Sequence, residues 1–262
     1  MKLTYNNQTI ELFGKKHFPD GPPDSVVVGV SGGLDSASIL FLLCKYFPNI
    51  KKFIYTGKDM VTPFDSEAAV DVVDWCKNNF TNHNIMSHDI IVYDDRDPKV
   101  LKEIRGWVDE DPSWYDKYAW IEFPDNPEKS MNHFLGKIAK PYLTYKAFSK
   151  VMEDNGCTMY IAAMTQNPPN KVMEQMNFAH LAETKRNEDR DDVKIIGNKF
   201  YHPLARVNKL FVQGVFEQEK LMNDYYHLTG SCTGTANETN FFMEPCKECF
   251  WCNEKMWAFG KY

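Results

Sequence analysis

The apolar positions of this chain form two alternating patterns, short continuous runs and longer segments with a period of about 3.6 residues. Ser25–Val30 is a continuous β-branched run, which is typical of a strand buried on both faces of a sheet. Ser36–Phe47 then carries its apolar residues at mostly helical spacings. Later segments repeat the alternation, with strands predicted at Lys52–Tyr55, Ile90–Tyr93 and Met159–Met164 and helices at Ser66–Phe80, Tyr142–Asn155 and Lys209–Tyr226.

This alternation predicts an α/β fold, with an open, mainly parallel sheet of five or six strands and helices on both faces. Residues 1–20 carry two asparagines between short apolar pieces, which favours a hairpin. Lys194–Phe200 resembles two short strands around a Gly-Asn turn. Gly106–Lys129 contains three Pro and three Trp, and we interpret it as a long functional loop.

The length and composition fit one globular domain with a small appendage. The chain has 262 residues, of which 43% are hydrophobic, enough to bury a core and to argue against disorder. We assign residues 1–205 to the main domain and residues 206–262 to a C-terminal helix and a cysteine-rich tail.

The charge balance favours a small-molecule substrate over a nucleic-acid partner. With 30 Lys+Arg against 36 Asp+Glu, the formal charge of −6 supplies no positive field for a phosphate backbone. The N-terminus has no apolar targeting segment, and the apolar runs are too short to span a membrane. Seven cysteines without a secretion signal indicate a reducing compartment, so we expect a cytoplasmic protein without a membrane partner. The sequence leaves a homodimer open.

A glycine-rich loop joins the first buried strand to the first helix, and it has the residue types that bind phosphate. Adjacent glycines allow a sharp turn and a close approach to a ligand, while serine hydroxyls and helix N–H groups can donate hydrogen bonds. Asp35 can hold a divalent cation or orient the loop, and we place it at a ligand-facing turn rather than in the core. The alternative is an ordinary Gly-Gly turn with a polar cap. The loop consists of Val30, Ser31, Gly32, Gly33, Leu34, Asp35 and Ser36.

The loop is neither a Walker loop nor the dinucleotide-binding G-x-G-x-x-G pattern. It resembles the SGGxDS loop of the PP-loop (N-type) ATP pyrophosphatases, which have the fold of adenine nucleotide alpha hydrolases. The resemblance implies that the loop grips the β- and γ-phosphates of ATP with Mg²⁺, and that a substrate oxygen attacks the α-phosphate. Asp35 and Ser36 are the catalytic candidates within the loop.

Four cysteines near the C-terminus have the spacing of a metal site. Cys246, Cys249 and Cys252 follow one another at three-residue steps, and Cys232 lies thirteen intervening residues upstream. Four converging thiolates suit a closed tetrahedral zinc site, which is our first interpretation. An iron–sulfur cluster is the main alternative. Cys44, Cys76 and Cys157 fall on apolar helix faces or at a helix end, and we treat them as core residues.

The order of motifs resembles that of the 7-cyano-7-deazaguanine synthase family. The resemblance spans about Ser25 to Phe259 and rests on the glycine loop, the cysteine tail and short motifs between them: Tyr55-Thr56-Gly57, Glu67-Ala68-Ala69, Pro203-Leu204 with Lys209, Ser231-Cys232 and Ala258-Phe259. It implies that Lys209 contacts phosphate, with a surface lysine as the alternative. The stretch Thr165–Lys171 differs from the family's substrate-handling stretch, so we expect a related planar heterocycle as substrate.

Taken with the resemblance, the sequence predicts an ATP-dependent ligase that adenylates a carboxylate or amide oxygen, releases pyrophosphate, and then substitutes AMP with a nitrogen nucleophile. Proximity and charge stabilisation by the loop and Mg²⁺ would supply most of the rate. One alternative has the same loop but a different reaction, that of a PP-loop sulfurtransferase or of an enzyme like PAPS reductase. A second alternative is a zinc-ribbon protein that binds nucleic acid.

Overall fold

The computed structural model describes residues 1–59, 64–94, 97–110, 127–179, 193–196, 198–234, 237–240 and 243–262. Within these residues the central element is a six-stranded sheet, in which every neighbouring pair is parallel except the last, β8 with β7. The predicted α/β fold class is confirmed. The strand order is β5 (Ile85–Tyr93), β4 (Lys51–Asp59), β3 (Ser25–Gly29), β6 (Met159–Ile161), β8 (Asn198–Tyr201) and β7 (Val193–Ile196).

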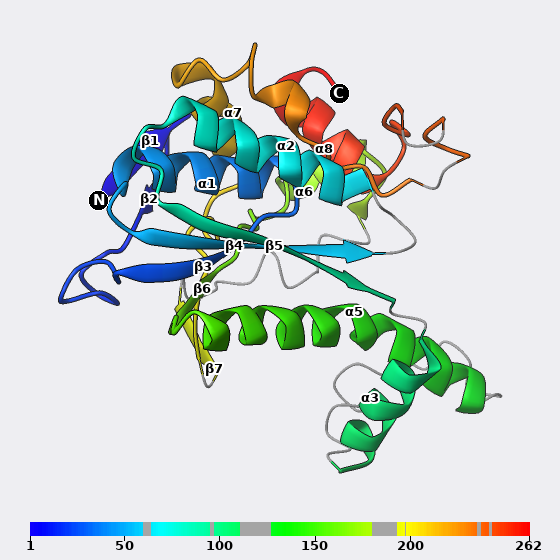
Figure 1. Cartoon of the computed structure of the whole chain (residues 1–262). Coiled ribbons are helices and arrows are strands. Elements are labelled where there is room, and N and C mark those ends of the chain that lie inside the picture. The colour runs from blue at the N-terminus through cyan, green and yellow to red at the C-terminus, as the bar shows by residue number, and fades with distance from the viewer. Residues whose placement is uncertain are drawn as a thin grey trace.

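Helices cover both faces of the sheet, as the sequence predicts (Figure 1). Successive side chains of a strand point to opposite faces. Val26 and Val28 accordingly pack into the larger core, whereas Val27 packs into a smaller core with Phe148 of α5. On the side of the larger core lie α1 (Leu34–Tyr46), α2 (Phe64–Asn79) and α7 (Lys209–Gln218), and on the other side lies α5 (Pro127–Asp154).

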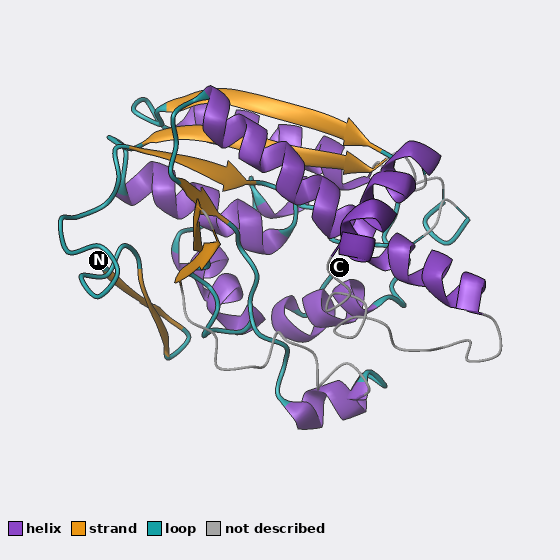
Figure 2. Cartoon of the chain, turned by 90° about the horizontal axis from the view of Figure 1, so that it is seen from below, coloured by secondary structure: helices purple, strands orange, loops and turns teal. Residues whose placement is uncertain are grey.

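The N-terminal hairpin lies beside the main sheet as a separate two-stranded sheet (Figure 2). It consists of β1 (Lys2–Tyr5) and β2 (Gln8–Glu11), and the turn residues Asn6 and Asn7 have φ angles of 47° and 58°. Asparagine tolerates this left-handed region, which two-residue hairpins require. The predicted hairpin is therefore confirmed, and so is the antiparallel pair β7 and β8.

The predicted loop over residues 106–129 is wrong at both of its ends. Its first residues belong to α3 (Pro98–Glu110), and its last residues belong to α5. Proline suits the first position of a helix, and both helices begin with one. Ile104 of α3 is completely buried, so this helix packs an apolar side chain against the rest of the chain. The remaining residues, 111–126, lie outside the described part of the chain.

The predicted helix over residues 209–226 is also too long, because α7 ends at Gln218. Lys220 adopts a left-handed φ of 59°, and the N–H of Leu221 donates to the carbonyl of Phe216 at 2.8 Å. This six-to-one bond is the helix stop of the Schellman type. The chain then continues through a short 3₁₀ helix, Tyr226–Leu228.

The C-terminal part shares the larger core with the rest of the chain. Phe211, Val215 and Phe216 of α7 belong to the same buried cluster as Val28 and Leu40. The division after residue 205 stays a prediction. Besides α3, two further helices that the sequence did not predict are described, α6 (Asn170–Gln175) and α8 (Phe250–Phe259). Among the described helices, none has both the length and the apolar composition needed to cross a membrane.

Candidate nucleotide and metal site

The strand order reverses between β3 and β6. From β3 the chain builds outward through β4 and β5 on one side, and later through β6 and β8 on the other. In open α/β sheets, ligands bind in the crevice outside the carboxyl ends of the strands at such a switch point. The glycine loop follows β3, and Thr165 lies shortly after β6. The predicted phosphate loop therefore lies where this fold binds ligands.

The glycine loop is held by hydrogen bonds among its own residues. Gly32 has a φ of 80°, a left-handed conformation that glycine adopts readily. Ser36 Oγ donates to the Gly33 carbonyl at 3.0 Å and accepts from the Ser31 N–H at 3.2 Å. Gly33 is the N-cap of α1, and no side chain caps this helix. Since the first N–H groups of a helix favour anions, the loop and the start of α1 together suit a phosphate.

The start of the loop is fixed to the neighbouring strand β4. The Val30 N–H donates to the Tyr55 carbonyl at 2.9 Å, and Thr56 Oγ1 donates to the Val30 carbonyl at 2.6 Å. Leu34, the first residue of α1, is buried in the larger core. The loop is therefore anchored at both ends by buried groups.

Asp35 is a buried group with several partners. The sequence places it at a ligand-facing turn rather than in the core, but only 9% of its surface is exposed, so its placement outside the buried interior is wrong. Its Oδ1 accepts from Lys209 Nζ at 2.6 Å, and its Oδ2 accepts from the Thr165 N–H and Oγ1 at 3.2 and 3.1 Å. A carboxylate accepting three hydrogen bonds holds the start of α1 against α7 and against the segment that follows β6. Its predicted contact with Mg²⁺ stays a prediction.

Lys209 lies at the centre of a buried charge cluster. It is the first residue of α7 and is 4% exposed, so the surface alternative is wrong. Besides Asp35, its Nζ lies 3.2 Å from Oε2 of Glu254, which is on α8 and 1% exposed. Buried charges are normally paired in this way, because an unpaired one loses its hydration without compensation. Three helices that are distant in sequence thus meet at one ammonium group.

Sequence reasoning assigned no role to two residues near the loop, Glu254 and Ser231, although Ser231 belongs to a motif of the family resemblance. Glu254 lies two residues after a predicted metal ligand, but nothing in that spacing indicates Lys209 as its partner. Ser231 Oγ is buried without a hydrogen-bond partner in the described part of the chain, and lies 3.5 Å from the position of a Cβ at Gly33. Next to it, the Gly230 N–H donates to the Gly32 carbonyl at 3.0 Å. The segment before Cys232 therefore touches the glycine loop.

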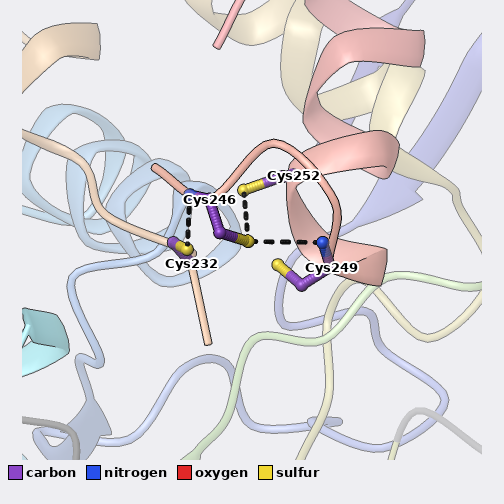
Figure 3. Close-up of side chains that lie close together, drawn as sticks. All are labelled: Cys232, Cys246, Cys249 and Cys252. Carbon is purple, nitrogen blue, oxygen red and sulfur yellow. Dashed lines mark hydrogen bonds between the residues drawn. The ribbon is translucent and has the colours of Figure 1, made fainter. Parts of the chain in front are cut away.

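The four predicted metal-ligating cysteines come together at the start of α8 (Figure 3). Their sulfur atoms all lie within 4.8 Å of one another, and Cys246 Sγ lies 4.0 Å from Cys252 Sγ. Tetrahedral zinc with Zn–S bonds of about 2.3 Å separates its sulfurs by about 3.8 Å. The four side chains, Cys232, Cys246, Cys249 and Cys252, therefore have both the number and the spacing that a metal ion requires.

Backbone N–H groups donate to two of the sulfurs and would stabilise thiolates, the form that binds metal. Cys232 Sγ accepts from the N–H groups of Gly234 and Cys246 at 3.3 and 3.2 Å, and Cys246 Sγ accepts from the Cys249 N–H at 3.3 Å. A hydrogen bond from Cys252 lowers the pKa of Cys249 and raises that of Cys252 in turn, while burial raises the pKa of Cys232. The donor set fits a metal ion. The other three cysteines, Cys44, Cys76 and Cys157, are buried in the core as predicted.

No protein-family model and no curated protein matches the chain. Solved structures similar to it include the U34-tRNA thiolase NcsA from Methanococcus maripaludis with its 4Fe–4S cluster (14% identity, TM-score 0.43), covering 81% of this chain and 62% of the thiolase. NMN synthetase from Francisella tularensis is similar at 11% identity and a TM-score of 0.44, over 92% of this chain and 79% of that one. An NH₃-dependent NAD synthetase from Campylobacter jejuni is similar at 11% identity and a TM-score of 0.42, over 81% of this chain and 71% of that one.

These proteins are members of the PP-loop ATP pyrophosphatase family, whose loop the sequence resembles. The chain spans less than two thirds of the length of the thiolase. At this low similarity, the chemistry of the site has to be argued from the chain's own residues.

Proposed function

We propose that this protein is an ATP-dependent ligase that transfers AMP to an oxygen of a small planar substrate and releases pyrophosphate. The observation that supports it is the position of the glycine loop, at the switch point of the sheet, with its Asp35 paired to the buried Lys209. Its partner would be a small molecule rather than a nucleic acid, in keeping with the net charge of −6.

The loop would hold the β- and γ-phosphates. Backbone N–H groups of the loop and of the first turn of α1 would donate to phosphate oxygens, together with the hydroxyls of Ser31 and Ser231. Lys209 would supply positive charge from its fixed position beside Asp35. Mg²⁺, when bound, would offset the charge that moves onto the leaving pyrophosphate.

In the first step, a substrate carboxylate oxygen would form a bond to the α-phosphorus, and the bond between that phosphorus and the oxygen bridging to the β-phosphate would break. Pyrophosphate would take the electron pair of the broken bond. A nitrogen nucleophile would then attack the activated carbonyl carbon and displace AMP, giving an amide. The protein's contribution would be orientation and electrostatic stabilisation, because both steps need the reacting atoms to be held close together.

The substrate class is proposed from the resemblance to 7-cyano-7-deazaguanine synthase. 7-Carboxy-7-deazaguanine with ammonium is therefore the first pair to test. The residues after β6 are occupied by contacts within the fold. Thr165 binds Asp35 of the glycine loop, and the Gln166 N–H donates to the Val207 carbonyl at 2.8 Å. The proposal therefore also includes planar carboxylates other than 7-carboxy-7-deazaguanine.

We propose zinc as the metal of the cysteine cluster, with a structural role. Four cysteines and no other ligand type in the described cluster fit closed zinc coordination. Elemental analysis of protein purified without chelators should give one zinc per chain. If the protein is brown and contains iron, the cluster is an iron–sulfur cluster and not a zinc site. That result would favour the sulfurtransferase alternative.

The experiment that tests the activity is pyrophosphate release from ATP across a panel of planar carboxylates, each with ammonium. We expect release with at least one member and at least a tenfold loss in Ser36→Ala, because its hydroxyl shapes the loop. Ser38→Ala is the matched control, since that hydroxyl bonds the helix carbonyl of Asp35 at 2.8 Å and lies outside the loop. Equal loss in both variants, or release in neither the native protein nor its variants, would contradict the proposal.

A further inference from the structure

The cysteine cluster and the glycine loop are joined by a short chain of buried charges. Cys249 is the N-cap of α8, Cys252 lies in its first turn, and Glu254 follows two residues later. Glu254 contacts Lys209 at 3.2 Å, and Lys209 contacts Asp35 of the glycine loop at 2.6 Å. One side chain thus separates the helix that carries two metal ligands from the helix that starts at the loop.

We propose that Glu254 couples the two sites, so that metal held by the cysteines strengthens the binding of ATP and bound ATP slows the loss of the metal. The inference rests on the proposed function, because it assumes that the loop binds ATP. It assigns Glu254 as a positioning residue that acts through Lys209.

The placement of Glu254 depends on the same turn of helix that the metal would fix. Two residues of an α-helix rise by about 3 Å, so Glu254 moves as one body with Cys252. A metal bound by Cys249 and Cys252 would hold this first turn of α8 in one orientation. Without it, the helix start would keep only its packing contacts and backbone bonds. The position of the Glu254 carboxylate therefore depends on the metal.

Burial makes this contact difficult to replace. Glu254 is 1% exposed and Lys209 is 4% exposed, so water cannot substitute for either partner without rearrangement of the surrounding residues. A lysine has a flexible four-carbon stem and three rotatable donors, so its ammonium position is set by the groups around it. With Asp35 on one side and Glu254 on the other, Nζ is held between two carboxylates. Displacement of Glu254 would let Nζ close onto Asp35 alone.

A second connection runs through the backbone. The Gly230 N–H donates to the Gly32 carbonyl, and Cys232 follows two residues after Gly230. This contact survives any substitution of a side chain at position 254. Replacing Glu254 should therefore weaken the coupling without removing it.

Coupling between two binding sites is reciprocal, so it can be measured from either ligand. The experiment loads the full-length protein with zinc and follows zinc transfer to a coloured chelator. It is run with and without saturating Mg²⁺ and α,β-methylene-ATP, whose linkage the proposed reaction cannot cleave. We expect the nucleotide to slow zinc transfer from the native protein at least fivefold, within the range typical of coupled sites.

Glu254→Gln keeps the shape of the side chain and removes its charge. We expect its nucleotide-dependent slowing to be at least threefold smaller than that of the native protein. Glu217→Gln is the matched control, since Glu217 is an exposed carboxylate of α7, and it should behave like the native protein. If Glu254→Gln cannot be isolated with zinc, Glu254→Asp, which shortens the reach of the same charge, should show the same reduction.

The outcomes separate this inference from the proposed function. If the native protein does not bind the nucleotide, measured by calorimetry, the proposed function fails. If it binds the nucleotide but zinc transfer is unchanged, the coupling is overturned and the proposed function stands. If the nucleotide slows zinc transfer from the position-254 variants as much as from the native protein, Glu254 is not the connecting residue.

Discussion

Replacing Gly234 by alanine tests the geometry of the cysteine cluster. A Cβ at position 234 would lie 2.8 Å from both Cys246 Cβ and Thr239 Cγ2, and 3.2 Å from Cys246 Sγ. Carbon atoms in favourable contact are about 3.5–4.0 Å apart. The backbone that carries Cys246 would therefore have to move by roughly 1 Å. Gly234 also donates its N–H to Cys232 Sγ, so the same movement would disturb a second ligand.

The expected magnitude follows from these overlaps. Overpacking a tight site costs about 1–3 kcal/mol, and in domains of this size each kcal/mol lowers the melting temperature by about 2–4 °C. We therefore expect a decrease of roughly 2–12 °C in the zinc-loaded protein. Metal–ligand distances tolerate about 0.2 Å, so a displaced sulfur should weaken zinc binding by about 10- to 100-fold.

The assay combines thermal unfolding with zinc competition against a chelator of known affinity. Gly106→Ala is the matched control, because among the described residues no atom beyond its chain neighbours and its own helix backbone lies within 4 Å of its Cβ position in helix α3. It should bind zinc like the native protein and unfold at the same or a slightly higher temperature, since alanine favours helix by about 0.5–1 kcal/mol. If Gly234→Ala bound zinc with native affinity and kept the native melting temperature, the described arrangement of the cysteines would be refuted.

Three further substitutions test contacts elsewhere in the fold, each by chemical denaturation. Gly29→Ala would place its Cβ 2.1 Å from Tyr160 Oη, so we expect a loss of at least about 1–3 kcal/mol and partial recovery on adding Tyr160→Phe. Lys52→Met removes three hydrogen bonds of 2.9 Å from a buried ammonium to backbone carbonyls, which should cost about 2–5 kcal/mol. For Glu219, burial alone would raise the pKa, but hydrogen bonds from Lys45 and two tyrosines lower it below the ordinary 4.5. Because a lowered carboxyl pKa stabilises the fold above the unfolded value, Glu219→Gln should destabilise at pH 7, and the difference should shrink as the pH falls below 4.5.

The substitutions of Lys52 and Glu219 each have a neighbouring control, and that of Gly29 is tested by the double variant. Lys51→Met, at an exposed position next to Lys52, should change stability by less than about 0.5 kcal/mol. Glu217→Gln, at an exposed position of α7, should change stability at pH 7 by less than about 0.5 kcal/mol. The expectations for Lys52 and Glu219 are wrong if variant and control are equally stable. The steric account of Gly29 is wrong if Tyr160→Phe gives no recovery in the double variant.

The main strands and the glycine loop could be predicted because their signals are local. The run at residues 25–30 is β-branched and continuous, and such a run has few alternatives to a buried strand. The four cysteines were found from spacing alone, because a metal site needs several sulfurs close together in space and short spacings supply them. Helix α3 was missed although Val100, Leu101 and Ile104 have helical spacing behind a proline, which is a readable signal.

The contacts that organise the site could not be predicted in this way. Asp35, Thr165, Lys209 and Glu254 are separated by 130, 44 and 45 residues along the chain, and only the packed sheet and helices bring them together. Asp35 is buried where Thr165, after β6, and Lys209 of α7 contact it, and no single segment of the sequence specifies these partners. From the sequence alone, an aspartate in a glycine loop can be interpreted as a cation ligand or as a residue that orients the loop.

The measurement that tests the central claim most directly is the identity of the products formed from ATP, followed by phosphorus NMR with Mg²⁺, ammonium and the active acceptor. If the glycine loop grips the β- and γ-phosphates and the α-phosphorus is attacked, AMP and pyrophosphate should form in equal amounts, and Lys209→Met should form neither at a comparable rate. Formation of ADP and inorganic phosphate as the products, or unchanged turnover in Lys209→Met, would contradict the account.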